Sequence, residues 1–321
     1  MNPDQYPCEI WLQIFRLACV DDGTTGRSLS LVCRFFREVS KEVKLQSLAI
    51  FGVEEMIQFS EILETLPEQD RKVRHLFMST EIASMRHRHD ASPRFERTQP
   101  YELDRDRYEY AVRVWGRLLS DLSTSLDTLY VFAIRLARSS LLAPVTLSCL
   151  TELHIAGPFP ACYDMNPIPT FPILSHLHLS GFHGFPIDVF RSIVSQAPRL
   201  VGLHLKPAQF SRNFCNDLLA VFQPKRNPSH SKSGSSNSSG CTKSKTGAAP
   251  VCMPSTFQRV YVTEPSGVDD ATSIHKESVH RLRLLSSKPS SKLVLAPPAP
   301  LLSLDAALEQ WEAMIRLRVM G

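Results

Sequence analysis

A six-residue pattern that recurs along the chain constrains its fold more than any other feature. Apolar residues occupy its first, fourth and sixth positions, and the clearest copies are LDTLYV from residue 126, LTELHI from 150, LSHLHL from 174, LVGLHL from 200 and FQRVYV from 257. Successive copies start 24, 24, 26 and 57 residues apart. Weaker copies are LQSLAI from 45, VRHLFM from 73 and VHRLRL from 279. Because alternate residues of a strand face the same way, each copy predicts a short strand with one apolar face.

Patterns of this kind, repeated every 20 to 29 residues or so, resemble the leucine-rich repeat, in which each copy contributes one strand and a returning segment. The resemblance implies an α/β solenoid, in which stacked short parallel strands with returning helices cover one another's apolar edges. Helical apolar spacing predicts such returns at 54–66, 106–122, 186–197 and 216–222. The ninth repeat position, which is often asparagine in regular repeats, here holds Ile134, Pro158, Phe182, Ala208 and Pro265, so we expect an irregular solenoid. The alternative is a mixed α/β domain with strands that recur by coincidence.

The first forty residues carry two strongly apolar helical patterns. In PCEIWLQIFRLAC, Ile10, Ile14 and Leu17 share one helical stripe, and Trp11 and Phe15 lie on the neighbouring one. SLSLVCRFFREVSKEV, which starts at residue 28, has apolar residues at helical spacing as well. So small a unit cannot bury such wide apolar faces by itself. Part of this surface must therefore meet a partner or the rest of the chain.

Residues 5–45 resemble an F-box, a three-helix module that docks on the Skp-type adaptor of cullin-RING ubiquitin ligases. The matching residues are Pro7, Glu9, Ile10, Ile14, Phe15, Leu31, Val32, Cys33, Arg34 and Phe36. Tyr6 stands where leucine is usual, and Phe36 stands where tryptophan is common. The resemblance implies binding to the Skp-type adaptor, and through it to a cullin, by Pro7, Ile10, Ile14, Val32 and Phe36. The alternative is an amphipathic helical pair that packs on the rest of the protein.

The distribution of charge and cysteine narrows the classes of partner and compartment. The net charge is +4, but residues 223–250 hold five Lys or Arg and no acid, so the remainder is close to neutral. A nucleic-acid reader would carry a continuous basic face, and we expect no nucleic-acid partner. We also expect no membrane association, because no signal peptide and no bilayer-length apolar run is present. Eight scattered cysteines without a CxxC pair favour a reduced intracellular compartment, the cytoplasm or the nucleus.

Composition divides the chain into four parts. The helical segment 5–45 precedes repeats over 46–223, a Ser- and Lys-rich insertion over 224–252 that we expect to be disordered, and final repeats with a C-terminal helix over 253–321. The last helix has a stripe of Leu304, Leu308, Trp311 and Ile315. Such a helix would cap the exposed end of a solenoid. A helix that binds a partner is the alternative.

The fifth position of the repeat predicts a binding surface. It holds Tyr130, His154, His178, His204 and Tyr261. Because these side chains point away from the core on strands about 4.8 Å apart, they could form one column of rings that recognises a target protein. Glu152, His176 and Arg259, at the third position, would lie beside the column. Binding there could change between about pH 5 and 7, since adjacent imidazoles resist joint protonation. The alternative is an ordinary polar sheet face.

Motifs for chemistry are missing from the sequence. It has no nucleophile elbow, no phosphate-binding loop and no dinucleotide-binding glycine pattern, so an enzyme is disfavoured and we expect no cofactor. RHRHD at 86–90 offers His87 and His89 but no third ligand, which favours a solvated loop over a metal site. The resemblance therefore implies a non-catalytic substrate-recognition subunit of an SCF-type ubiquitin ligase. A repeat scaffold that binds proteins without any ligase role is the alternative.

Overall fold

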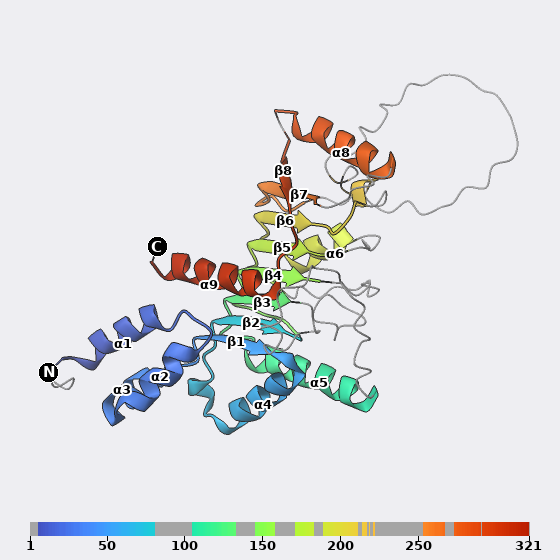
Figure 1. Cartoon of the computed structure of the whole chain (residues 1–321). Helices are drawn as coiled ribbons and strands as arrows, with labels where there is room; N and C mark the ends of the chain where they lie inside the picture. Colours follow the sequence, from blue (N-terminus) through green and yellow to red (C-terminus); the bar gives the residue numbers. More distant parts are fainter. Residues whose placement is uncertain are drawn as a thin grey trace, which may run out of the picture.

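The computed structural model describes residues 6–80, 105–132, 145–157, 171–182, 189–210, 214–216, 218, 221, 253–266, 273–289 and 291–320. Within them the chain forms an α/β fold around an eight-stranded, all-parallel sheet whose strands lie side by side in chain order (Figure 1). The strands are β1 (Ser47–Phe51), β2 (His75–Ser79), β3 (Thr128–Phe132), β4 (Glu152–Ala156), β5 (His176–Ser180), β6 (Gly202–Lys206), β7 (Arg259–Pro265) and β8 (Leu293–Ala299). The predicted fold class is confirmed at this level. The predicted insertion at 224–252 and the pair His87 and His89 lie outside the described residues.

Seven strands, β1 to β7, coincide with predicted copies of the six-residue pattern. The prediction of a strand at VHRLRL is wrong, because this segment belongs to the helix α8 (Ser273–Ser286). Val279, Leu282 and Leu285 are buried there at a spacing of three residues, which places them on one side of a helix. The last strand, β8, was not predicted and pairs in parallel with β7.

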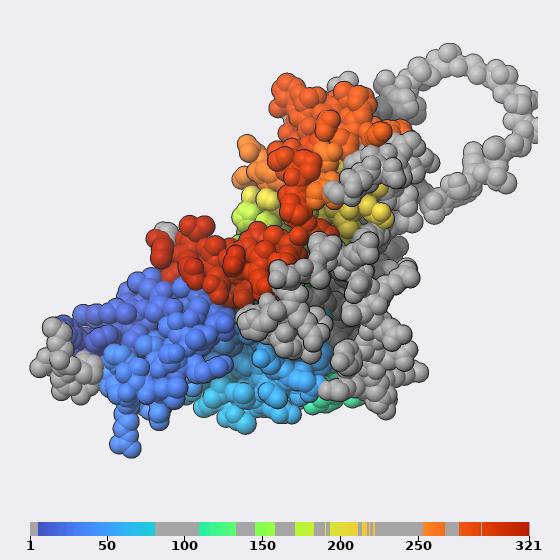
Figure 2. Space-filling view, in the orientation of Figure 1, coloured from blue at the N-terminus to red at the C-terminus, as the bar shows by residue number. Residues whose placement is uncertain are grey.

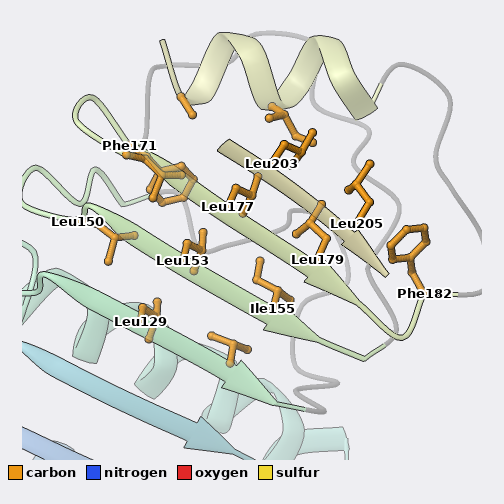
Figure 3. Close-up of a cluster of buried hydrophobic side chains, with 14 of the residues drawn as sticks. Leu129, Leu150, Leu153, Ile155, Phe171, Leu177, Leu179, Phe182, Leu203 and Leu205 are labelled. Atoms are coloured by element: carbon orange, nitrogen blue, oxygen red, sulfur yellow. The ribbon is translucent and has the colours of Figure 1, made fainter. Parts of the chain in front are cut away.

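One face of the sheet, here called the core face, carries the fourth- and sixth-position apolar residues of the repeats. Figure 3 shows part of it, with Leu129, Leu153, Leu177 and Leu203 on successive strands. Each of these four side chains is at most 4% exposed. This face packs against α4 (Gly52–Thr65), α5 (Arg105–Asp121), α6 (Val189–Gln196) and α8 in one apolar core. The first three of these helices coincide with predicted returns, and the fourth return, 216–222, is described only in part.

Three helices precede the sheet: α1 (Cys8–Ala18), α2 (Thr24–Val32) and α3 (Arg34–Ser40). Extended backbone at Cys33 separates α2 from α3, and its sulfur accepts a hydrogen bond from the amide of Phe36. Phe15, Cys19 and Val43 form the buried centre of this helical unit. Gly26 lets α2 approach the chain closely, since a Cβ there would lie 2.2 Å from the carbonyl oxygen of Lys44.

The C-terminal helix α9 (Leu304–Met320) lies on the other face of the sheet, here called the ring face. Its fully buried Trp311 and Ile315 pack in one cluster with Phe51, Phe77 and Tyr130 of the first three strands. Figure 1 shows α9 on one side of the sheet, near β3. The sequence suggested that this helix caps the exposed end of the solenoid. Instead it packs on a face of the sheet near the first three strands, away from the β8 end. Among the described helices, none is both long enough and apolar enough to cross a bilayer.

Candidate binding surfaces

The first candidate surface is the exposed apolar side of α1 and α2. Ile10, Ile14 and Leu17 are 48%, 46% and 55% exposed, and their spacing places them on one stripe of α1. Leu31 and Val32, at the end of α2, are 75% and 63% exposed. Pro7 is exposed as well, directly before the first residue of α1. Four of the five residues implied to contact an adaptor are thus accessible to a partner, and Leu17 and Leu31 are further exposed apolar residues on the same two helices.

Phe36, the fifth of these residues, has a different position. Its ring packs between the helices, with centroids 4.9 Å from Trp11 and 5.0 Å from Phe15, and it is only partly exposed. Its main contacts are therefore internal, where it helps to fix α3 against α1. Its role in docking stays a prediction, since the ring is also partly exposed.

The helical unit is attached to the sheet by polar contacts as well as by apolar packing. The buried Gln46, next to β1, donates from Nε2 to the carbonyl oxygens of Arg16 at 3.1 Å and Cys19 at 3.4 Å, at the end of α1. The Ser47 hydroxyl donates to the carbonyl oxygen of Asp21 at 2.6 Å. These bonds satisfy carbonyl groups that the helix end and the following turn leave free. They hold the end of α1 and the following turn against the start of β1. In Figure 2 the N-terminal helical unit, in dark blue, lies directly against the light-blue segment that follows it.

The second candidate surface is the ring column, defined by Tyr130, His154, His178, His204 and Tyr261. The sheet register places each ring directly opposite the next. Successive ring centroids are 4.8, 3.8, 4.1 and 4.4 Å apart, and the planes of neighbouring rings differ by 8° to 16°. The five rings therefore form a continuous stack, as the spacing of the repeats suggested.

Part of the ring column is covered. Tyr130 is 2% exposed in the apolar cluster with α9, and His154 is 7% exposed. A target protein cannot contact these two buried rings in this structure, which corrects their assignment as contact residues. His178, His204 and Tyr261 are partly exposed and remain candidates.

Glu152 joins the column to α9. Its Oε1 lies 2.8 Å from His154 Nε2 and 3.8 Å from His178 Nε2. Its Oε2 lies 3.0 Å from Nη2 of Arg318, whose Nη1 also donates to Thr151 Oγ1 at 2.9 Å. Because a carboxylate only accepts, the short contact requires His154 to donate from Nε2. Sequence reasoning placed Glu152 beside the column but missed Arg318, whose partners lie more than 160 residues away.

Two histidines of the column, His178 and His204, have lowered pKa values. Burial, together with the neighbouring histidines, holds the pKa of His178 far below its ordinary range. Burial also lowers the pKa of His204 to about 4. Both imidazoles are therefore mainly neutral between pH 5 and 7. Burial acts to raise the pKa of Glu152, but the hydrogen bond to His154 and the charge of Arg318 outweigh it, so this pKa is lowered.

Comparison with known proteins adds no family to this description. A scan against protein-family models, a search of curated proteins and a search of solved structures each found no match.

Proposed function

We propose that this chain is a substrate-recognition adaptor of an SCF-type ubiquitin ligase, with α1 to α3 acting as an F-box and the strands acting as an irregular leucine-rich-repeat solenoid. The exposure of Ile10, Ile14 and Val32 is the observation that carries the proposal. Residues 5–45 resemble the F-box motif in the order of its residues, and four of the five residues that the resemblance implies for docking are exposed: Pro7, Ile10, Ile14 and Val32. Exposed contiguous apolar side chains are typical of sites that bind another protein.

In this role the chain does no chemistry itself. The helical unit holds the Skp-type adaptor, and through it a cullin, while the accessible part of the ring face holds a target protein. Transfer of ubiquitin is then promoted by proximity, because both reacting groups are held in one complex at high effective concentration. The contact residues for the target reduce to His178, His204 and Tyr261, together with the exposed Arg259, which is the third residue of its repeat copy and the first residue of β7. Such a complex would operate in the cytoplasm or the nucleus.

A pull-down of the full chain with a Skp-type adaptor tests the proposal. The double variant Ile10→Asp with Ile14→Asp should lose adaptor binding by roughly 100-fold or more, because two anions would enter an apolar contact that each isoleucine stabilises by about 1 to 3 kcal/mol. The matched control is Ile62→Asp with Leu284→Asp, which makes the same kind of change at exposed apolar positions on α4 and α8. The control should bind as the wild type does.

The alternative function is a repeat scaffold that binds proteins without a ligase role. It would be favoured if the wild-type chain failed to bind the adaptor, or if both double variants bound it equally well. Partial burial of the helical unit gives this alternative some support, since Phe15, Cys19 and Val43 are already covered within the chain. The exposed stripe of α1 favours the adaptor role over it.

A further inference from the structure

Three groups with metal-binding donor atoms meet on the ring face, apart from the surface proposed to bind the adaptor. Glu152 and His154 lie two residues apart on β4 and so face the same side of the sheet. The register of β4 and β5 places His178 directly opposite His154. The parallel register thus brings together two imidazoles and one carboxylate that are separated in the sequence.

The distances within this cluster suit a small cation. The donor atoms of Glu152, His154 and His178 all lie within 4.8 Å of one another. The carboxylate Oε1 is 2.8 Å from one Nε2 atom and 3.8 Å from the other. A tetrahedral zinc ion with bonds of about 2.0 to 2.2 Å keeps its ligand atoms roughly 3.3 Å apart, which is between these two distances.

The donor groups also suit metal binding. Zinc is bound in proteins by imidazole nitrogen and carboxylate oxygen, and these are the donor atoms that this cluster offers. The stacked rings of His154 and His178 are parallel within 8°. Because His154 donates from Nε2 to Glu152, a metal ion bound at this nitrogen would take the place of the proton, which is released on binding. Convergence on one ion requires one ring to tilt out of the stack. His178 is the ring that can tilt, because its side chain is 25% exposed whereas that of His154 is 8% exposed.

We propose that Glu152, His154 and His178 form a three-ligand site for a divalent transition-metal ion of the zinc class. Two nitrogen ligands favour such an ion over Mg²⁺ or Ca²⁺, which prefer oxygen. Three protein ligands leave a fourth tetrahedral position for water or for a donor atom of a bound protein. This inference goes beyond the adaptor function and does not depend on it.

The charge of Arg318 should weaken metal binding at this site. Its guanidinium holds the second oxygen of Glu152 and lies beside Asp127 as well, with 3.4 Å between Nη1 and Oδ1. A metal ion at Oε1 would share the carboxylate with this cation and would be repelled by it. Removal of the charge in Arg318→Met should therefore tighten metal binding by roughly tenfold. If Arg318 only positioned the Glu152 side chain, its removal would not tighten metal binding.

Calorimetric titration of the metal-free full chain with ZnCl₂ at pH 7.5 tests the proposal. We expect one tight site, weakened by roughly 100-fold in Glu152→Gln and in His178→Ala. His280→Ala, at an exposed position of α8, and the pair His87→Ala with His89→Ala are the controls and should leave this site intact. Circular dichroism of each variant checks that it is folded.

A second measurement needs no variant. Co²⁺ added to the wild-type chain should give the intense visible absorption of a tetrahedral site with nitrogen and oxygen ligands, and Zn²⁺ should displace it. The proposal is overturned if Zn²⁺ does not bind, or if binding is lost only in the His87 and His89 control. It is also overturned if folded Glu152→Gln and His178→Ala bind Zn²⁺ as the wild type does, because the cluster would then be a hydrogen-bonded network alone.

Discussion

At the scale of the residue, burial on the ring face controls how the chain responds to acid. His75, on β2, is 2% exposed, and its Nδ1 lies 3.0 Å from Thr128 Oγ1. Burial lowers its pKa from 6.5 to about 4, because the charges of Arg74 and Arg318 also oppose protonation and the attraction of Asp127 does not compensate. The unfolded chain therefore binds this proton at a higher pH than the folded chain does.

Acid should destabilise the protein through His75. The contribution of the neutral His75 to the free energy of unfolding is complete above about pH 6.5. It is lost as the pH falls toward 4, since over that interval mainly the unfolded chain binds the proton. At pH 5 this group alone should cost roughly 2 kcal/mol. His75→Asn keeps a nitrogen near Thr128 Oγ1 and should reduce the loss between pH 7.5 and pH 5 by about that amount in urea unfolding. The exposed control His280→Asn should lose as much free energy of unfolding between pH 7.5 and pH 5 as the wild type does. An equal loss in His75→Asn would show that His75 is not the source of the acid sensitivity.

At the scale of the element, the strands were predictable because alternation of apolar residues is a local property. The segment around Val279 shows where this fails: its apolar spacing fits a strand and a helix equally, and the fourteen-residue length of α8 decides for the helix. β8 was missed because LVLAPPA reads as a proline-rich linker. The position of α9 could not be predicted, because an apolar stripe fits any apolar surface. Contacts such as those of Trp311 with Phe77, and of Arg318 with Glu152, become visible only in three dimensions.

The packing of α9 on the sheet should contribute to the stability of the protein, mainly through Trp311. Trp311 is fully buried, with its ring centroid 5.7 Å from that of Phe77. Trp311→Ala should lower the free energy of unfolding by about 3 to 5 kcal/mol, because a large cavity would be left between the helix and the sheet. Leu317→Ala, on the same helix at 75% exposure, should change it by less than about 0.5 kcal/mol. Similar unfolding midpoints for the two variants would show that α9 does not pack on the sheet in solution.

At the scale of the whole molecule, the strands lie in the sheet in chain order, so each connection joins two neighbouring strands. Such a fold tolerates long connections. β6 and β7 pair over four consecutive residue pairs, starting with Gly202 opposite Arg259, although 57 residues separate the starts of their repeat copies. Each strand is held mainly by its two neighbours and by the core beneath it. The lengths of the connections therefore matter less to the fold than the pairing of the strands.

Deletion of residues 226–250 tests this tolerance. The register of β6 with β7 does not involve these residues, and shortening a long connection changes its closure entropy by less than about 1 kcal/mol. The thermal unfolding midpoint and the binding of a Skp-type adaptor should stay as in the full chain. A Gly/Ser segment of equal length is the control for spacing. A large fall in the midpoint in both variants would show that the deleted residues contribute to the folded core.

The composition of β8 has a consequence for the solution behaviour of the protein. An unpaired strand at the edge of a sheet can be extended by a strand from another molecule, and this is a common route to aggregation. Pro297 and Pro298 lie within β8, and proline has no amide hydrogen to donate to an incoming strand. The sheet thus ends in a segment that disfavours its growth from one copy of the chain into the next.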